Sequence, residues 1–75
     1  MQMLRFRLKE LIQDKSFKEG RRVTLGEVSE ATGIHKTTLS RLQNPTGYNT
    51  TTETINLLCK YFQCEVGDLV VYIND

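Results

Sequence analysis

The segment from Gly33 to Asn44, GIHKTTLSRLQN, concentrates side chains that exchange protons or form hydrogen bonds. It holds the chain's single histidine, His35, with a lysine, two threonines, a serine and an arginine. His35 could act as a general base for a nearby serine nucleophile. Such catalysis also needs an acid that orients the histidine and a cleft that binds the substrate. No acid stands at a triad-like position, and 75 residues provide little material for a cleft. We therefore predict a recognition surface, and a protein that is not an enzyme.

The two cysteines, Cys59 and Cys64, are the other candidates for chemistry. Their spacing is not C-x-x-C, and the chain has no second Cys/His pair to complete a zinc site. Both fall in an apolar-periodic stretch, which predicts buried free thiols in a reducing cytosol. We predict no metal, no cofactor and no small-molecule ligand.

Charge is segregated along the chain. Residues 1–44 carry nine Lys or Arg and five Asp or Glu, a net charge of +4, whereas residues 45–75 carry −3. Such asymmetry indicates a side that faces a polyanion, although the total charge is only +1. No apolar run is long enough for a signal peptide or a membrane span, so we predict a soluble cytoplasmic protein with no membrane partner.

The elements that must position these side chains can be read from periodicity. Residues 2–5 alternate charged and apolar side chains, and residues 70–73 are β-branched or aromatic, so both read as strands. A polar linker is expected from residue 14 to residue 22. Apolar periodicity predicts five helices, over about 6–16, 25–32, 36–43, 51–63 and 66–70.

Capping signals mark two helix starts and one helix end. Thr24 with Glu27, and Thr50 with Glu53, each form a T-x-x-E capping box, in which the Thr hydroxyl and the Glu carboxylate accept backbone N–H groups. Gly33 follows the second helix, where a left-handed glycine commonly ends a helix. Two short helices therefore flank a tight glycine turn.

Two short helices around a glycine turn, with polar side chains on the second, describe a helix-turn-helix. The stretch TLGEVSEATGIHKTTLSRLQN resembles the helix-turn-helix of the Cro-like, phage-repressor-type (XRE) family. The stretch TINLLCKYFQCEVGDLVVYI is similar to the fourth and fifth helices of a small-protein branch of that family. The resemblance implies an all-α, compact five-helix fold, with residues 1–75 as a single DNA-binding domain of prokaryotic or phage type and the helix-turn-helix at about 24–43.

The resemblance also implies site residues. Lys36, Thr37 and Arg41 match the positions that read base edges, with Thr38 beside them. Arginine or lysine suits guanine, and a threonine methyl suits thymine. The phosphate contacts are expected at Arg21, Arg22, Thr24, His35, Ser40, Asn44, Tyr48, Asn49 and Thr50.

Three positions depart from the family pattern. Leu25 stands where a polar phosphate contact is common, and the basic and polar side chains of the two long linkers are expected to replace that contact. Ser29 stands where a small alanine is usual, which is a mild change. His35 stands where a serine or threonine usually caps the recognition helix, and it is expected to serve as a cap or as a phosphate contact.

One such module presents few base contacts, so tight binding implies a homodimer on a two-fold site with half-sites about 34 Å apart. Four apolar residues exceed what one small body can bury, namely Leu57, Tyr61, Val71 and Ile73. Either residues 2–5 pair with 70–73 in a short two-stranded β-ribbon, or these side chains form a dimer interface. We predict both, with the ribbon near the two-fold axis.

The function predicted from these features is sequence-specific binding of double-stranded DNA by a small transcription regulator, a repressor. The alternative is a protein-interaction module of the same fold, such as an antitoxin-like or coactivator subunit. The positive charge around the predicted recognition helix favours DNA, because an interaction module does not need it.

Overall fold

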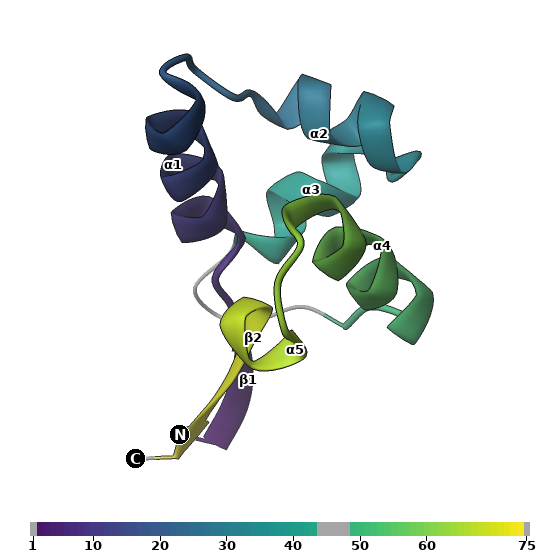
Figure 1. Ribbon diagram of the computed structural model, residues 1–75. Coiled ribbons are helices and arrows are strands. Elements are labelled where there is room, and N and C mark those ends of the chain that lie inside the picture. The colour runs from purple at the N-terminus through teal and green to yellow at the C-terminus, as the bar shows by residue number, and fades with distance from the viewer. Residues whose placement is uncertain (1, 44–48, 75) are drawn as a thin grey trace.

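The computed structural model describes residues 2–43 and 49–74, with the side chains of Gln2 and Met3 left aside. Five helices and a small two-stranded antiparallel sheet agree with the predicted Cro-like fold (Figure 1). In chain order the elements are β1 (Gln2–Phe6), α1 (Leu8–Glu19), α2 (Leu25–Thr32), α3 (Lys36–Leu42), α4 (Thr52–Phe62), α5 (Val66–Leu69) and β2 (Val70–Asn74).

One small core joins all of these elements. Each helix contributes a side chain with essentially no exposed surface, and Leu39 and Leu42 both come from α3. Burial of a leucine side chain stabilises the fold by about 1.5–3 kcal/mol. The core consists of Phe6, Leu8, Val23, Val28, Ile34, Leu39, Leu42, Leu58 and Leu69.

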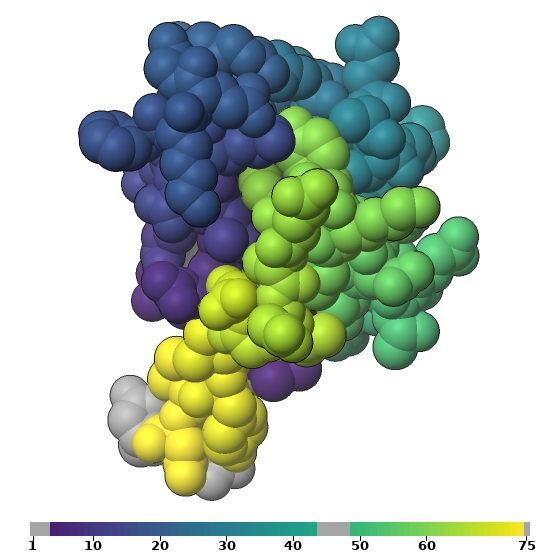
Figure 2. Space-filling view, in the orientation of Figure 1, coloured from purple at the N-terminus to yellow at the C-terminus, as the bar shows by residue number. Residues whose placement is uncertain are grey.

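The predicted ribbon is present. Strands β1 and β2 pair antiparallel from Gln2 opposite Asn74 to Phe6 opposite Val70. The Arg7 N–H donates to the Leu69 carbonyl at 2.7 Å and extends the ladder into the body. Beyond the buried Phe6 the ribbon projects away from the helices, as the yellow strand in Figure 2 shows.

Helix α1 is longer than the sequence predicts. The prediction ends it near residue 16 and begins a linker, but the helix continues to Glu19. An ion pair between Lys15 Nζ and Glu19 Oε2 at 2.7 Å, one turn apart, accompanies the extra turn. The helix then ends at Gly20, whose φ of 66° is left-handed. Polar composition alone therefore gave a wrong boundary.

Both predicted capping boxes differ in detail. Thr24 does cap α2, since its Oγ1 accepts the Glu27 N–H at 3.2 Å, but both Glu27 carboxylate oxygens bind Arg21. The cap of α4 is Thr51, whose Oγ1 accepts the Thr54 N–H at 3.2 Å, and the prediction of Thr50 is wrong by one residue. Neighbouring threonines have similar capping propensity, so tertiary packing decides which one ends up at the helix start.

Candidate nucleic-acid interface

The turn between α2 and α3 is fixed by backbone geometry and by two hydroxyl groups. Gly33 has φ 79°, and its N–H donates to the Ser29 carbonyl at 2.8 Å, as predicted for a left-handed helix end. The Ser29 hydroxyl donates to the Ile34 carbonyl at 2.5 Å. The Thr32 hydroxyl donates to the Val28 carbonyl at 2.7 Å and accepts the Ile34 N–H at 3.2 Å. These bonds set the angle at which α3 leaves α2.

Helix α3 has an inner apolar face and an outer polar face. Leu39 and Leu42 are 0% and 1% exposed, so they anchor the helix to the core. Residues three or four apart lie on the same face of a helix. Four polar side chains are exposed in this way on the opposite side, and Thr38 beside them is half-buried. The four are Lys36, Thr37, Ser40 and Arg41.

His35 occupies the N-cap position of α3, with φ −58° and ψ 139°. Its side chain is exposed and makes no capping hydrogen bond. Of the two roles predicted for His35, the side-chain cap is therefore wrong. The phosphate contact stays a prediction.

The connection from α1 to α2 carries a network of ion pairs. Arg21 Nη1 and Nη2 donate to the two carboxylate oxygens of Glu27, both at 2.7 Å. Arg21 Nη2 also lies 2.8 Å from Glu19 Oε1, and Glu19 binds Lys15. Arg22, the next residue, is exposed, and no carboxylate within residues 2–43 and 49–74 pairs with it.

These contacts shift the titration of the groups involved. The hydrogen bond from Arg21 is the main cause of a lowered pKa for Glu27, and the hydrogen bond from Lys15 plays the same role for the pKa of Glu19. The pKa of Arg21 is raised, mainly by its hydrogen bond to Glu27. Each charged partner favours the ionised form of the other. The sequence analysis missed this network, because its central partners, Arg21 and Glu27, are six residues apart and are separated by the start of α2.

The remaining predicted phosphate contacts differ in how exposed their side chains are. Thr24 is exposed, and its hydroxyl keeps a hydrogen to donate while its oxygen caps α2. Asn49 is exposed and Thr50 half-buried in the segment before α4. Asn44 and Tyr48 lie outside the described residues.

The predicted dimer residues separate into two pairs. Leu57 and Tyr61 are partly buried against the chain's own core, and Lys15 Nζ lies 4.9 Å from the centre of the Tyr61 ring. Val71 and Ile73 are half-buried on the ribbon, beside a hollow that Arg5 also lines. The structure thus separates α4 residues that pack internally from ribbon residues that lie away from the core.

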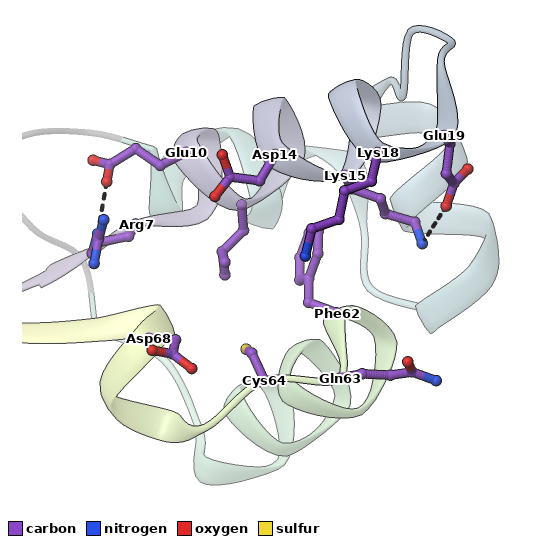
Figure 3. A pocket seen from close by; sticks show the side chains of 11 residues that line it. Arg7, Glu10, Asp14, Lys15, Lys18, Glu19, Phe62, Gln63, Cys64 and Asp68 are labelled. Carbon is purple, nitrogen blue, oxygen red and sulfur yellow. Dashed lines mark hydrogen bonds and ion pairs between the residues drawn. The ribbon is translucent and has the colours of Figure 1, made fainter.

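A groove of about 500 Å³ separates α1 from the end of α4 and from α5 (Figure 3). Asp14 lies on the α1 side of the groove, and Asp68 and Cys64 lie on the opposite side. Burial, and next the neighbouring Cys59, raises the pKa of the Cys64 thiol to about 11. The thiol is therefore protonated at neutral pH, whereas a thiolate is the form that reacts as a nucleophile.

Neither a metal cluster nor a membrane-spanning helix is present in the part of the chain that the structure describes. No group of three or more His, Cys, Asp or Glu there is arranged to hold a metal ion. None of the helices in this part has the length and apolar character needed to cross a bilayer. Both cysteines are free and partly buried.

Comparison with known proteins gives a family and a fold. The family model for the Cro/C1-type HTH DNA-binding domain matches residues 7–75. The crystal structure of the transcriptional regulator VanUg, Form II, superposes with a TM-score of 0.74 at 21% sequence identity. The superposition covers 99% of this chain and 89% of that chain, and at this identity it shows similarity of fold. No curated protein matches.

Proposed function

Because the chain belongs to the family of Cro/C1-type HTH DNA-binding domains, we propose that it binds specific sequences of double-stranded DNA as a small transcription regulator. The observation that carries this proposal is the outer face of α3. There Lys36, Thr37, Ser40 and Arg41 are exposed directly opposite two buried leucines. A helix anchored on one side and polar on the other suits insertion into a major groove.

The base contacts are assigned to the exposed face of α3. Arg41 and Lys36 donate to guanine O6 and N7, and the methyl group of Thr37 contacts a thymine methyl. Thr38 is half-buried, so only the exposed part of its side chain, next to Thr37, contacts a base. Each good direct contact discriminates against a wrong base by about 1–3 kcal/mol.

The phosphate contacts surround this face. Arg22 supplies a positive charge that no described carboxylate neutralises, and the Thr24 hydroxyl can donate from the start of α2. Neutralised phosphates release counterions, which makes the affinity fall as salt rises. The remaining proposed contacts are His35, Ser40, Asn44, Tyr48, Asn49 and Thr50.

Two copies bind together on a two-fold site. A single α3 face offers few base contacts, and a dimer doubles them with half-sites about one helical turn, or 34 Å, apart. The exposed apolar side chains of the ribbon support an interface there, since Leu4 and Tyr72 are 54% and 56% exposed. A dimer bound over a promoter in the cytoplasm would exclude polymerase, so we assign the protein as a repressor.

Selection from a randomised duplex library with the purified protein tests this function. We expect an enriched palindrome, and an affinity whose logarithm falls by about 0.9 per phosphate contact for each log unit of salt. Binding of every duplex with equal affinity would contradict sequence-specific regulation. Absence of duplex binding would instead leave the protein-interaction module as the function of this fold.

A further inference from the structure

Arg21 is surrounded by carboxylates at the entrance to α2. Three short contacts engage its guanidinium, two with Glu27 at 2.7 Å and one with Glu19 at 2.8 Å. A guanidinium has five N–H donors, so these contacts occupy three of them in a fixed orientation. The two parallel bonds to Glu27 form the bidentate geometry that Arg and carboxylate groups favour.

The position of Glu27 creates an electrostatic conflict with DNA. Glu27 lies in the first turn of α2, where its N–H binds Thr24 Oγ1, so its carboxylate is close to a proposed phosphate contact. A carboxylate stabilises the N-terminus of a helix, but it repels a phosphate that approaches the same turn. Glu19 adds a second negative charge beside it.

We propose that Arg21 is a positioning residue that masks the charges of Glu19 and Glu27, so that a DNA phosphate can approach the first turn of α2. This inference rests on the DNA-binding function proposed above. Arg21 acts through the two carboxylates, and Arg22 is the neighbouring side chain that binds the phosphate. The two adjacent arginines therefore have different roles.

The geometry favours masking over direct phosphate contact by Arg21. To bind a phosphate through its Nη groups, Arg21 must break charge-assisted bonds to two carboxylates that are already in place. The freed carboxylates would then face the phosphate. Lys15 partly neutralises Glu19 but does not replace Arg21 at Glu27, because its Nζ binds Glu19 Oε2 and lies over the Tyr61 ring.

The test compares Arg21→Met, Glu19→Gln/Glu27→Gln and the combined triple variant on the selected duplex. We expect Arg21→Met to weaken binding about two- to threefold, as one uncompensated unit charge about 8 Å from a phosphate would do in water. We expect the triple variant to bind at least as tightly as the wild type and to keep its salt dependence, because no carboxylate of the network is left to repel the phosphate.

Three outcomes would overturn this proposal. If Arg21 binds a phosphate, the triple variant stays as weak as Arg21→Met, and its salt slope falls by about 0.9. If Arg21 only ties α1 to α2, the triple variant stays weak with an unchanged slope. If wild-type protein binds no duplex at all, the proposed function fails and this inference fails with it. Arg22→Met is the matched control for loss of a direct phosphate contact. This variant should bind more weakly, and its salt slope should be reduced by about 0.9.

Discussion

The Ser29 hydroxyl donates a 2.5 Å hydrogen bond to the carbonyl of Ile34, across the turn that joins α2 to α3. Ser29 lies on the last turns of α2, and Ile34 is 7% exposed. The bond therefore satisfies a carbonyl at a residue that belongs to the core. It also holds the two helices of the motif at a fixed angle.

Replacing Ser29 with alanine should destabilise the protein. A buried acceptor that loses its donor costs about 1–3 kcal/mol. The free energy of unfolding, measured by urea titration, should fall by that amount. Ser40→Ala removes a hydroxyl from the exposed face of α3 and should change stability by less than about 0.5 kcal/mol. Equal losses in the two variants would contradict the assigned role of the turn bond.

Replacing Arg41 with alanine should relax base preference at one position of each half-site. The lost contact with a guanine edge corresponds to about 1–3 kcal/mol of discrimination. Duplex selection with the variant measures this directly. Arg22→Ala should instead weaken binding to all duplexes by a similar factor. An Arg41→Ala protein that selects the wild-type sequence would refute the base contact.

The Arg21 network should stabilise the fold in a way that depends on pH. Glu19 and Glu27 have a lowered pKa in the folded protein, caused by Lys15 and Arg21. A lowered folded-state pKa gives stability that is present above the ordinary carboxyl value of about 4.3 and is lost as the pH falls below it. The difference in unfolding free energy between wild type and Arg21→Met should therefore shrink from pH 7 to pH 3.

The control for that pH series is Arg22→Met, since Arg22 pairs with no carboxylate in the described part of the chain. Its stability difference from wild type should stay constant between pH 7 and pH 3. A constant difference for Arg21→Met as well would mean that the network does not contribute to stability in solution.

Changing Tyr72 to lysine should weaken dimerisation without unfolding the monomer, because Tyr72 is 56% exposed on the face of the ribbon that supports the proposed interface. Sedimentation equilibrium at micromolar concentration should show a shift toward monomer, and affinity for a two-fold site should fall more than affinity for a single half-site. Val66→Lys, at a 58% exposed position of α5, is the matched control. Leu57→Glu is unsuitable, since Leu57 packs against the core.

Changing His35 to alanine tests its predicted phosphate contact. An imidazole ring can donate a hydrogen bond to a phosphate oxygen, and alanine has no donor in its side chain. Because a phosphate contact carries no base information, affinity for all duplexes should fall by a similar factor in the variant. Unchanged affinity would place His35 away from the phosphate backbone.

The helix-turn-helix was predictable because its signals are local. Thr24, Gly33 and the alternation of buried Leu39 with polar neighbours lie within a short stretch of sequence, and each is a signal for the helix in which it lies or which it bounds. The ribbon was predictable for a different reason. Both strand segments carry β-branched or alternating side chains, and the small core leaves them few other partners.

Features that depend on tertiary contacts were not predictable. The ion pair of Arg21 with Glu27 joins the end of the α1 connection to α2, so neither periodicity nor capping signals indicate it. The extra turn of α1 lies within one helix, but its polar side chains carry no apolar periodicity. Ser29 was interpreted as a mild replacement of alanine, whereas its hydroxyl crosses the turn. The assigned DNA contacts also remain predictions, since they depend on a partner whose surface the chain alone does not contain.

The pairing of Gln2 with Asn74 also constrains the order of folding. Contacts within α2, the turn and α3 join residues close in sequence, and such contacts form early and fast. The ribbon instead closes a loop that spans nearly all described residues, so it cannot form on the ribosome until residue 74 has emerged. A nascent chain would therefore form the local contacts of α2, the turn and α3 before the ribbon, and the core that anchors α3 would close only after Leu58 and Leu69 have emerged.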